Sequence, residues 1–273
     1  MLVLRVIVLT AAILVVTMPI YWIVITSLKT NAEVINTAQL TFYPHKLTLQ
    51  NYKDMFTQLN FGLYLKNSLY LSLLSSMLVT VISILGGYGL SRYSFKSKKM
   101  IMLFVLVTQM IPSILILIPM YSVFAKMKII SRAPHIALFC YYVVANIPFC
   151  LLTMKSFFEN IPYALEEAAM IDGCSRIDCM VKIVIPIMLP SIMAVFCFAF
   201  IGAWNELMAG IIFTSQPSSW TIPVGLKSLI NKLGVPWGTL MAGGTMALLP
   251  TGVMFFIAQK YIVSGLTAGA VKE

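Results

Sequence analysis

The chain has 273 residues, of which 60% are hydrophobic and only 10% are charged. A soluble domain carries about 25% charged residues. The 19 Lys and Arg and 9 Asp and Glu residues are therefore too few to cover a water-facing globule of this size. The composition excludes a soluble enzyme, an intrinsically disordered chain and a disulfide-stapled secreted module, and it indicates an integral membrane protein.

The net charge of +10 does not indicate a nucleic-acid partner. The cations are spread between apolar runs and form no stripe with interleaved aromatic residues, so we expect them to orient the spans and contact membrane lipid. No two of the five cysteines form a CxxC pair, and the two histidines, His45 and His135, lie far apart. A metal site needs clustered ligands, so none is predicted.

Six apolar runs are long enough to cross a bilayer as helices, which takes about 20 residues. They cover residues 3–28, 63–90, 100–125, 134–157, 183–213 and 239–263. We therefore predict one all-α transmembrane domain over residues 1–273. Prolines inside these runs should kink the helices, among them Pro112, Pro119, Pro148 and Pro250. Small residues such as Gly86 and Gly87 should let helices approach closely.

Six spans place both termini on one side of the membrane, but the charges hardly say which side. The segments on the side of the termini hold ten Lys and Arg residues, and those on the opposite side hold nine. The densest cluster, within residues 92–99, weakly favours termini in the cytoplasm.

The most informative segment is the polar connection of residues 158–182, which holds five of the nine acidic residues. Pro162 suits a first helical turn, Glu166 to Ala169 favour a helix, and Asp172-Gly173 should end it. A second short helix is predicted from Ser175 towards Lys182, and Pro186 should begin or interrupt the next span. The pattern predicts a helix–turn–helix outside the bilayer that could dock into a groove on a partner. By itself it is more typical of a solvated polar loop with a helix cap.

The spacing in this segment resembles the EAA signature of permease subunits of binding-protein-dependent ABC importers. In words, that signature is Glu-Ala-Ala, three residues, Gly, nine residues, Ile, one residue, Leu, Pro. Glu167-Ala168-Ala169 and Gly173 fit, and Ile183-Val184-Ile185-Pro186 follows at the required distance, with Ile185 in place of leucine. Further segments resemble the MalG-like subunit of carbohydrate importers along nearly the whole chain: 19–29, 67–70, 87–93, 202–206, 221–226 and 259–272.

The resemblance implies a six-span permease domain in a bacterial cytoplasmic membrane, with both termini cytoplasmic. It also implies that the loop of residues 158–182 is a coupling helix seated in a cleft of an ATPase subunit. Glu167 would be the polar anchor, and Gly173 would set the turn. The implied coupling residues are Glu166, Glu167, Ala168, Ala169, Asp172, Gly173 and Pro186.

The resemblance further implies three protein partners: a second, MalF-like permease, an ATP-binding cassette ATPase dimer and an extracytoplasmic sugar-binding protein. The chain has no phosphate-binding loop of the GxxxxGK[ST] type. We therefore expect a non-catalytic subunit that binds no cofactor, with ATP and Mg²⁺ on the partner ATPase.

Two further groups of residues have open interpretations. Trp204, Asn205 and Glu206 form the most polar cluster inside a span, which fits either a substrate path or gate or a hydrogen-bond network between helices. The tail of residues 264–273 fits either a frayed terminus or, by resemblance, a second ATPase contact through Gly265, Gly269 and Lys272.

Two other classes of membrane protein fit the sequence less well than the importer. A self-contained secondary transporter would use Glu206 as its ion or proton site, but such folds often contain internal repeats, and none is visible here. A membrane enzyme would need histidines and acids clustered near a membrane face. The one acidic cluster, in residues 159–178, contains no histidine.

Overall fold

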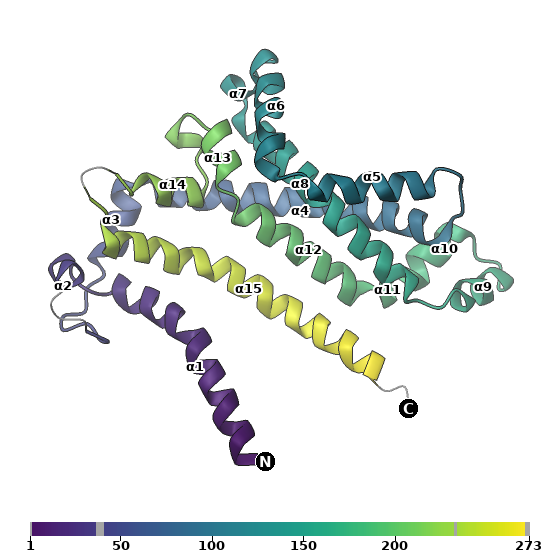
Figure 1. Cartoon of the computed structure of the whole chain (residues 1–273), viewed down its shortest axis with the longest axis horizontal. Helices are drawn as coiled ribbons and strands as arrows, with labels where there is room; N and C mark the ends of the chain where they lie inside the picture. The colour runs from purple at the N-terminus through teal and green to yellow at the C-terminus, as the bar shows by residue number, and fades with distance from the viewer. Residues whose placement is uncertain (1, 37–40, 232–233, 271–273) are drawn as a thin grey trace. The chain divides into compact units, whose positions relative to one another are not determined.

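The computed structural model describes residues 2–36, 41–231 and 234–270, and for residues 2, 258 and 260–270 only the course of the backbone. The described residues form helices and no extended strand (Figure 1). The first helices are α1 (Leu2–Ser27), α2 (Asn31–Ile35), α3 (Gln50–Gln58), α4 (Phe61–Arg92), α5 (Lys98–Met110), α6 (Ser113–Lys126), α7 (Ile129–Arg132) and α8 (Pro134–Glu159). They are followed by α9 (Ala164–Ile171), α10 (Arg176–Cys179), α11 (Ile185–Ile187), α12 (Leu189–Trp204), α13 (Met208–Phe213), α14 (Ile222–Ser228) and α15 (Trp237–Ala270).

Within the described residues, four helices are long and apolar enough to cross a membrane: α1, α4, α8 and α15. Two bent pairs pass the same test, α5 with α6 at 97° and α10–α11 with α12 at 76°. The predicted all-α membrane fold is confirmed. The count of six spans is reached when each bent pair is taken as one span.

The larger bend follows from proline chemistry. Ile111 precedes Pro112 and adopts an extended conformation, with φ −83° and ψ 121°, because the proline ring disfavours a helical residue before it. Pro112 therefore separates α5 from α6, as expected of a helix breaker. The helices α6, α8 and α15 continue through Pro119, Pro148 and Pro250.

The second bend lies beyond the predicted proline. Pro186 sits inside the short helix α11, and the chain turns at Met188, immediately before α12. Between α10 and α11 the chain forms a wider π turn, Met180–Val184.

The chain divides into two compact units, of which the first comprises residues 1–67 and 220–251. In it, the buried Asn51 amide donates to the carbonyls of Ser27 and Lys29, both at 2.8 Å. The last carbonyls of a helix lack partners within it, so Asn51 stabilises the end of α1. The α4–α14 contact is also close, because Tyr64 lies against Gly225 and its ring is 5.9 Å from that of Trp220.

The second unit comprises residues 68–219 and 252–273. Its helices α8 and α12 pack along each other (Figure 1). Its first apolar core includes Val79, Val143, Met154, Phe158, Val184 and Val195. The predicted close approach is found at Gly87, where a β-carbon would lie 3.0 Å from the backbone nitrogen of Lys155 in α8. This unit holds the 158–182 loop and most of the predicted site residues.

Candidate functional site

The 158–182 loop contains the predicted helix–turn–helix. Helix α9 ends in a Schellman motif, in which Gly173 N–H donates to Met170 and Cys174 N–H donates to Ala169. Gly173 has φ +91°, which glycine adopts without the steric cost of a β-carbon. The turn predicted from Asp172-Gly173 is therefore the one observed.

Helix α10 begins with a capping box formed by two polar side chains. Ser175 Oγ accepts from Asp178 N–H at 3.2 Å, and the Asp178 carboxylate accepts from Ser175 N–H at 3.3 Å. Asp178 also pairs with Lys182, one turn further on, at 2.5 Å. Because both ends of the turn are closed by local hydrogen bonds, the two short helices have a defined geometry.

Neighbouring residues of α9 face opposite ways. Glu166 and Ala169 are buried, whereas Glu167 and Ala168 are exposed. Ala169 therefore packs against this chain's own core, and Ala168 faces outward. Asp172 and Gly173 lie on the exposed side, at the turn.

The buried Glu166 carboxylate is held by the end of α4. It accepts from Arg92 Nε at 2.6 Å and from the Tyr88 hydroxyl at 2.7 Å. Arg92 Nη2 also donates to the carbonyl of Ile161 at 2.9 Å. The Arg92 and Glu166 side chains are 7% and 3% exposed, so both charges are buried and paired. Glu166 and Glu167 are both predicted from the sequence as coupling residues, but in the structure Glu166 is buried and Glu167 is exposed.

The outer face of the loop combines an acid with apolar side chains. Among the described residues, no hydrogen bond or ion pair engages the Glu167 carboxylate. Ile171 is 86% exposed, Ile177 is 72% exposed, and Val181 is also exposed. Exposed apolar side chains on a well-formed element are typical of a protein-binding surface. We call Glu167, Ala168, Ile171, Asp172 and Ile177 the outer loop surface.

The Trp204–Asn205–Glu206 cluster lies where α12 ends and α13 begins. The buried Trp204 ring stacks on Phe200 with a centroid separation of 5.6 Å. Glu206 Oε1 accepts from Ala209 N–H at 2.9 Å and so stabilises the start of α13. Asn205 is exposed. Two members therefore have a structural use, and no side-chain hydrogen bond to another described residue engages Asn205.

A cavity that the sequence did not predict lies between the α5–α6 bend and α8. Its volume is about 660 Å³, and its walls include Phe104, Thr108, Gln109, Ser113, Tyr141 and Phe149. None of the residues that line it is charged. No hydrogen bond to another described residue engages the exposed Gln109 amide. The one sequence feature that could have indicated this cavity is Gln109, a glutamine three residues before Pro112 inside an apolar run.

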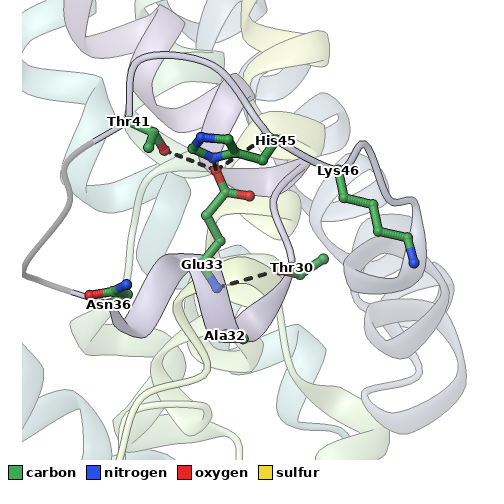
Figure 2. Close-up of a pocket in the computed structure, with 7 residues that line it drawn as sticks. All are labelled: Thr30, Ala32, Glu33, Asn36, Thr41, His45 and Lys46. Atoms are coloured by element: carbon green, nitrogen blue, oxygen red, sulfur yellow. Dashed lines mark hydrogen bonds and ion pairs between the residues drawn. The ribbon is translucent and has the colours of Figure 1, made fainter.

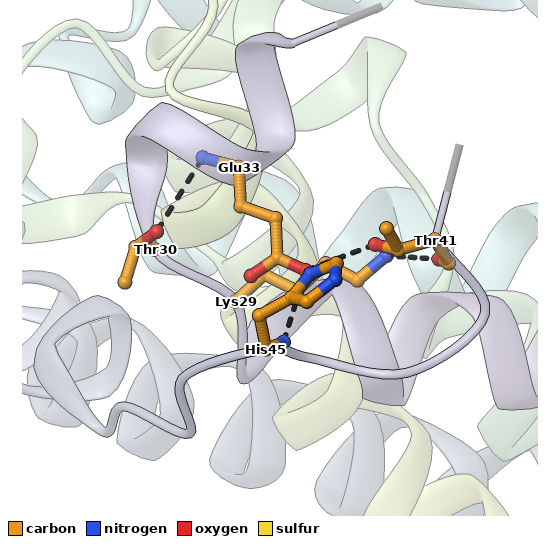
Figure 3. A network of polar contacts seen from close by, with 5 residues as sticks. All are labelled: Lys29, Thr30, Glu33, Thr41 and His45. Atoms are coloured by element: carbon orange, nitrogen blue, oxygen red, sulfur yellow. Dashed lines mark hydrogen bonds and ion pairs between the residues drawn. The ribbon is translucent and has the colours of Figure 1, made fainter. Parts of the chain in front are cut away.

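A smaller cavity of about 330 Å³ lies in the first unit and is lined by α2 and the connections on either side of it (Figure 2). The Glu33 carboxylate accepts from Thr41 Oγ1 at 2.9 Å and from His45 N–H at 3.2 Å, and His45 Nδ1 lies 3.1 Å away. Lys29 Nζ donates to the Thr41 carbonyl, so Thr41 contacts both Lys29 and Glu33 (Figure 3). Burial works to raise the pKa of Glu33, but the bonds from Thr41 and His45 outweigh it and hold the pKa below its ordinary value. These hydrogen bonds link α2 to residues 41–45 of the connection that follows it.

The predicted tail contact is only partly within the described residues. Helix α15 continues to Ala270 and therefore includes Gly265 and Gly269. Lys272 lies outside the described residues, so its predicted role stays a prediction.

Comparison with known proteins agrees with this architecture. Residues 79–268 match the family model of the binding-protein-dependent transport system inner membrane component. The sulfoquinovosyl glycerol transport system permease protein SmoH of Agrobacterium fabrum is 36% identical over 93% of this chain and 88% of its own length. The trehalose/maltose transport system permease protein MalG of Thermococcus litoralis is 34% identical, over 93% and 91%.

The fold is also that of a solved transporter. A chain of a bacterial ABC transporter involved in the import of the acidic polysaccharide alginate superposes with a TM-score of 0.77, at 17% identity, over 95% of both chains. The fold and the relatives match over nearly the whole chain, and the family model matches residues 79–268. The chain belongs to the family of inner-membrane components of binding-protein-dependent transport systems.

Proposed function

We propose that this chain is one permease subunit of an ATP-driven importer of sugars or oligosaccharides. Its relatives support this proposal, because SmoH is named for sulfoquinovosyl glycerol transport and the Thermococcus MalG for trehalose and maltose transport. The importer would also contain a second, MalF-like permease, an ATPase dimer that binds ATP and Mg²⁺, and an extracytoplasmic sugar-binding protein.

The single observation that best supports coupling is the outer loop surface. The exposed Ile171 and Glu167, whose carboxylate has no partner among the described residues, both project from α9, and the turn that joins α9 to α10 is closed by hydrogen bonds. A polar anchor surrounded by apolar side chains is what a protein cleft binds. ATP binding would close the ATPase dimer, and this loop would transmit the closure as a rigid-body movement of spans.

The proposed ATPase contact also implies an orientation of the chain in the membrane. If six spans cross the membrane, the loop between the fourth and fifth lies on the same side as both termini and as the connection after α4. The Arg92–Glu166 pair agrees with that arrangement, because it joins the end of α4 to the loop. A cytoplasmic ATPase therefore implies cytoplasmic termini in a bacterial cytoplasmic membrane. The basic residues near 92–99 would then also be cytoplasmic.

For the sugar path, we propose the cavity at the α5–α6 bend together with Asn205. Its uncharged hydroxyl and amide groups and aromatic walls are suited to a neutral polyhydroxylated ligand. The Gln109 amide has no hydrogen-bond partner among the described residues, and an amide without a partner is costly in lipid, so Gln109 fits a polar path better than a lipid-facing surface.

The proposal is tested by purifying the tagged chain from native membranes in mild detergent and identifying its companions by mass spectrometry. We expect a Walker-type ATPase, a second permease and a solute-binding protein, and ATP-dependent sugar uptake after reconstitution. A chain that purifies alone and moves solute without ATP would contradict the proposal and favour the secondary transporter.

A further inference from the structure

Glu166 and Arg92 form a buried ion pair that the proposed ATPase contact does not use. Their side chains are almost fully enclosed, and the two residues lie 74 positions apart in the sequence. A buried ion pair adds little net stability compared with well-packed apolar side chains. Stability alone therefore does not account for two charges at this place. Such a pair instead fixes the relative orientation of the two segments that carry it, because charge-assisted hydrogen bonds have a defined geometry.

The pair belongs to a cluster that attaches the loop to α4 at several points. Tyr88 and Arg92 are one helical turn apart, so both side chains project from the same face of α4. Each Glu166 carboxylate oxygen has its own donor, at 2.7 and 2.6 Å. Arg92 also reaches the carbonyl of Ile161, just before α9. Bonds to two separate places on the loop oppose its rotation about either one.

Aromatic contacts extend this attachment to both helices of the loop. The Arg92 guanidinium lies 5.7 Å from the centre of the Tyr163 ring, and Arg176, in α10, lies 5.4 Å from that of Tyr93. The Tyr88 ring also packs edge-on against Phe158 at the end of α8, with centroids 5.5 Å apart. The end of α4 therefore contacts α8 and both halves of the helix–turn–helix.

We propose that Tyr88, Arg92 and Glu166 form a buried joint that makes the 158–182 loop and α4 move as one body. Glu166 is then a positioning residue, and its neighbour Glu167 is the residue that meets the ATPase. A displacement received at the outer loop surface reaches α4 through the joint without being absorbed by the loop. This inference rests on the proposed function and adds to it how movement passes from the loop to a span.

The test uses the complete transporter in proteoliposomes and measures the sugar imported per ATP hydrolysed. In Glu166→Ala the outer loop surface is unchanged, so we expect the ATPase to co-purify and hydrolysis to continue. The sugar imported per ATP should fall on the order of 10-fold, the scale of typical coupling between sites. Glu167→Ala should instead weaken ATPase co-purification. A lower ratio in Glu166→Ala with weaker ATPase co-purification in Glu167→Ala would show that Glu166 acts in the joint and Glu167 in the ATPase contact.

Two further variants keep the test decisive if Glu166→Ala assembles poorly. Tyr88→Phe removes one hydrogen bond and keeps the ring packed on Phe158, so we expect assembly to be normal and the sugar imported per ATP to fall several-fold. The exchange of Arg92→Glu with Glu166→Arg should recover part of the ratio lost in Glu166→Ala. As a matched control, Glu159→Gln removes the surface pair with Lys155, at 2.6 Å, and should leave the ratio unchanged.

The joint is overturned if Glu166→Ala and Tyr88→Phe both import sugar with the wild-type ratio. It is also overturned if Glu166→Ala loses the ATPase while Tyr88→Phe remains fully coupled, because the pair would then only maintain the fold. A wild-type complex that shows no ATP-dependent uptake would overturn the proposed function itself, which is a separate result.

Discussion

At the level of single residues, the turn between α9 and α10 depends on one backbone conformation. Gly173 has φ +91°, and a β-carbon there would meet no neighbouring atom within 4 Å. Substitution is therefore opposed by the backbone and not by crowding. A left-handed conformation costs a residue with a β-carbon about 1–2 kcal/mol, and asparagine tolerates it better than β-branched residues.

We predict that Gly173→Val distorts the turn and uncouples ATP hydrolysis from sugar uptake, whereas Gly173→Asn stays close to wild type. Both variants add a side chain at an open position, so they differ chiefly in how well they accept positive φ. Uptake and hydrolysis are measured in parallel in proteoliposomes. Equal uptake by the valine and asparagine variants would show that the turn conformation does not matter for coupling.

A second residue-level prediction concerns pH at the Glu33 network. The pKa of Glu33 is held below its ordinary value of 4.5 in the folded loop. The stabilisation of the loop by this carboxylate is therefore complete above pH 4.5 and is lost as the pH falls through the lowered pKa. Hydrogen exchange of the His45 amide, corrected for its intrinsic pH dependence, should accelerate in that acidic range.

The matched variant for this prediction is Glu33→Gln, which keeps an acceptor but no longer titrates. Its His45 amide should exchange faster than wild type near neutral pH and show no further loss of protection in acid. The same acid-induced loss in both proteins would assign the transition to another group.

Sequence reasoning succeeded where the signal was local and failed where it was not. The αL glycine and the Ser175 cap follow from residue types within a few positions of each other. The burial of Glu166 could not be predicted, because charged residues usually face water and its partner Arg92 lies 74 positions away. Nothing in a Glu-Glu pair tells which carboxylate faces the core.

At the level of helices, the two bent spans are the least predictable elements. An apolar run shows that residues 100–125 are long enough to cross a bilayer, but not that the chain turns by 97° at Pro112. Pro19, Pro119, Pro148 and Pro250 lie in similar runs and leave their helices continuous. Whether a proline breaks or bends a helix is decided by the packing around it, which the sequence does not display.

The α5–α6 bend carries its own prediction, because it forms a wall of the proposed sugar path. We predict that Gln109→Ala raises the sugar concentration needed for half-maximal uptake about 3- to 10-fold, as expected from losing one hydrogen bond. The maximal rate and the ATPase co-purification should change little. A matched control is Ile118→Ala, an exposed position on α6 outside the cavity, which should behave as wild type. Unchanged half-saturation in Gln109→Ala would remove this cavity from the path.

At the level of the whole molecule, the all-α membrane class followed directly from composition, because 10% charged residues cannot solvate a globule of this size. The EAA spacing identified the family, which the family model over residues 79–268 confirms. The division of roles between an inner and an outer face of the loop needed the structure, since both faces come from the same eight-residue helix.

The central claim is that the outer loop surface meets the ATPase, and a photo-crosslinking amino acid at Ile171 tests it most directly. Ile171 is 86% exposed, so the probe should not disturb packing. The control places the probe at Tyr43, 65% exposed in the connection between α2 and α3, which the proposed orientation puts on the opposite side of the membrane. We predict an ATPase adduct from position 171 and none from position 43. Adducts from both positions, or no ATPase adduct from 171 in an active transporter, would contradict the account.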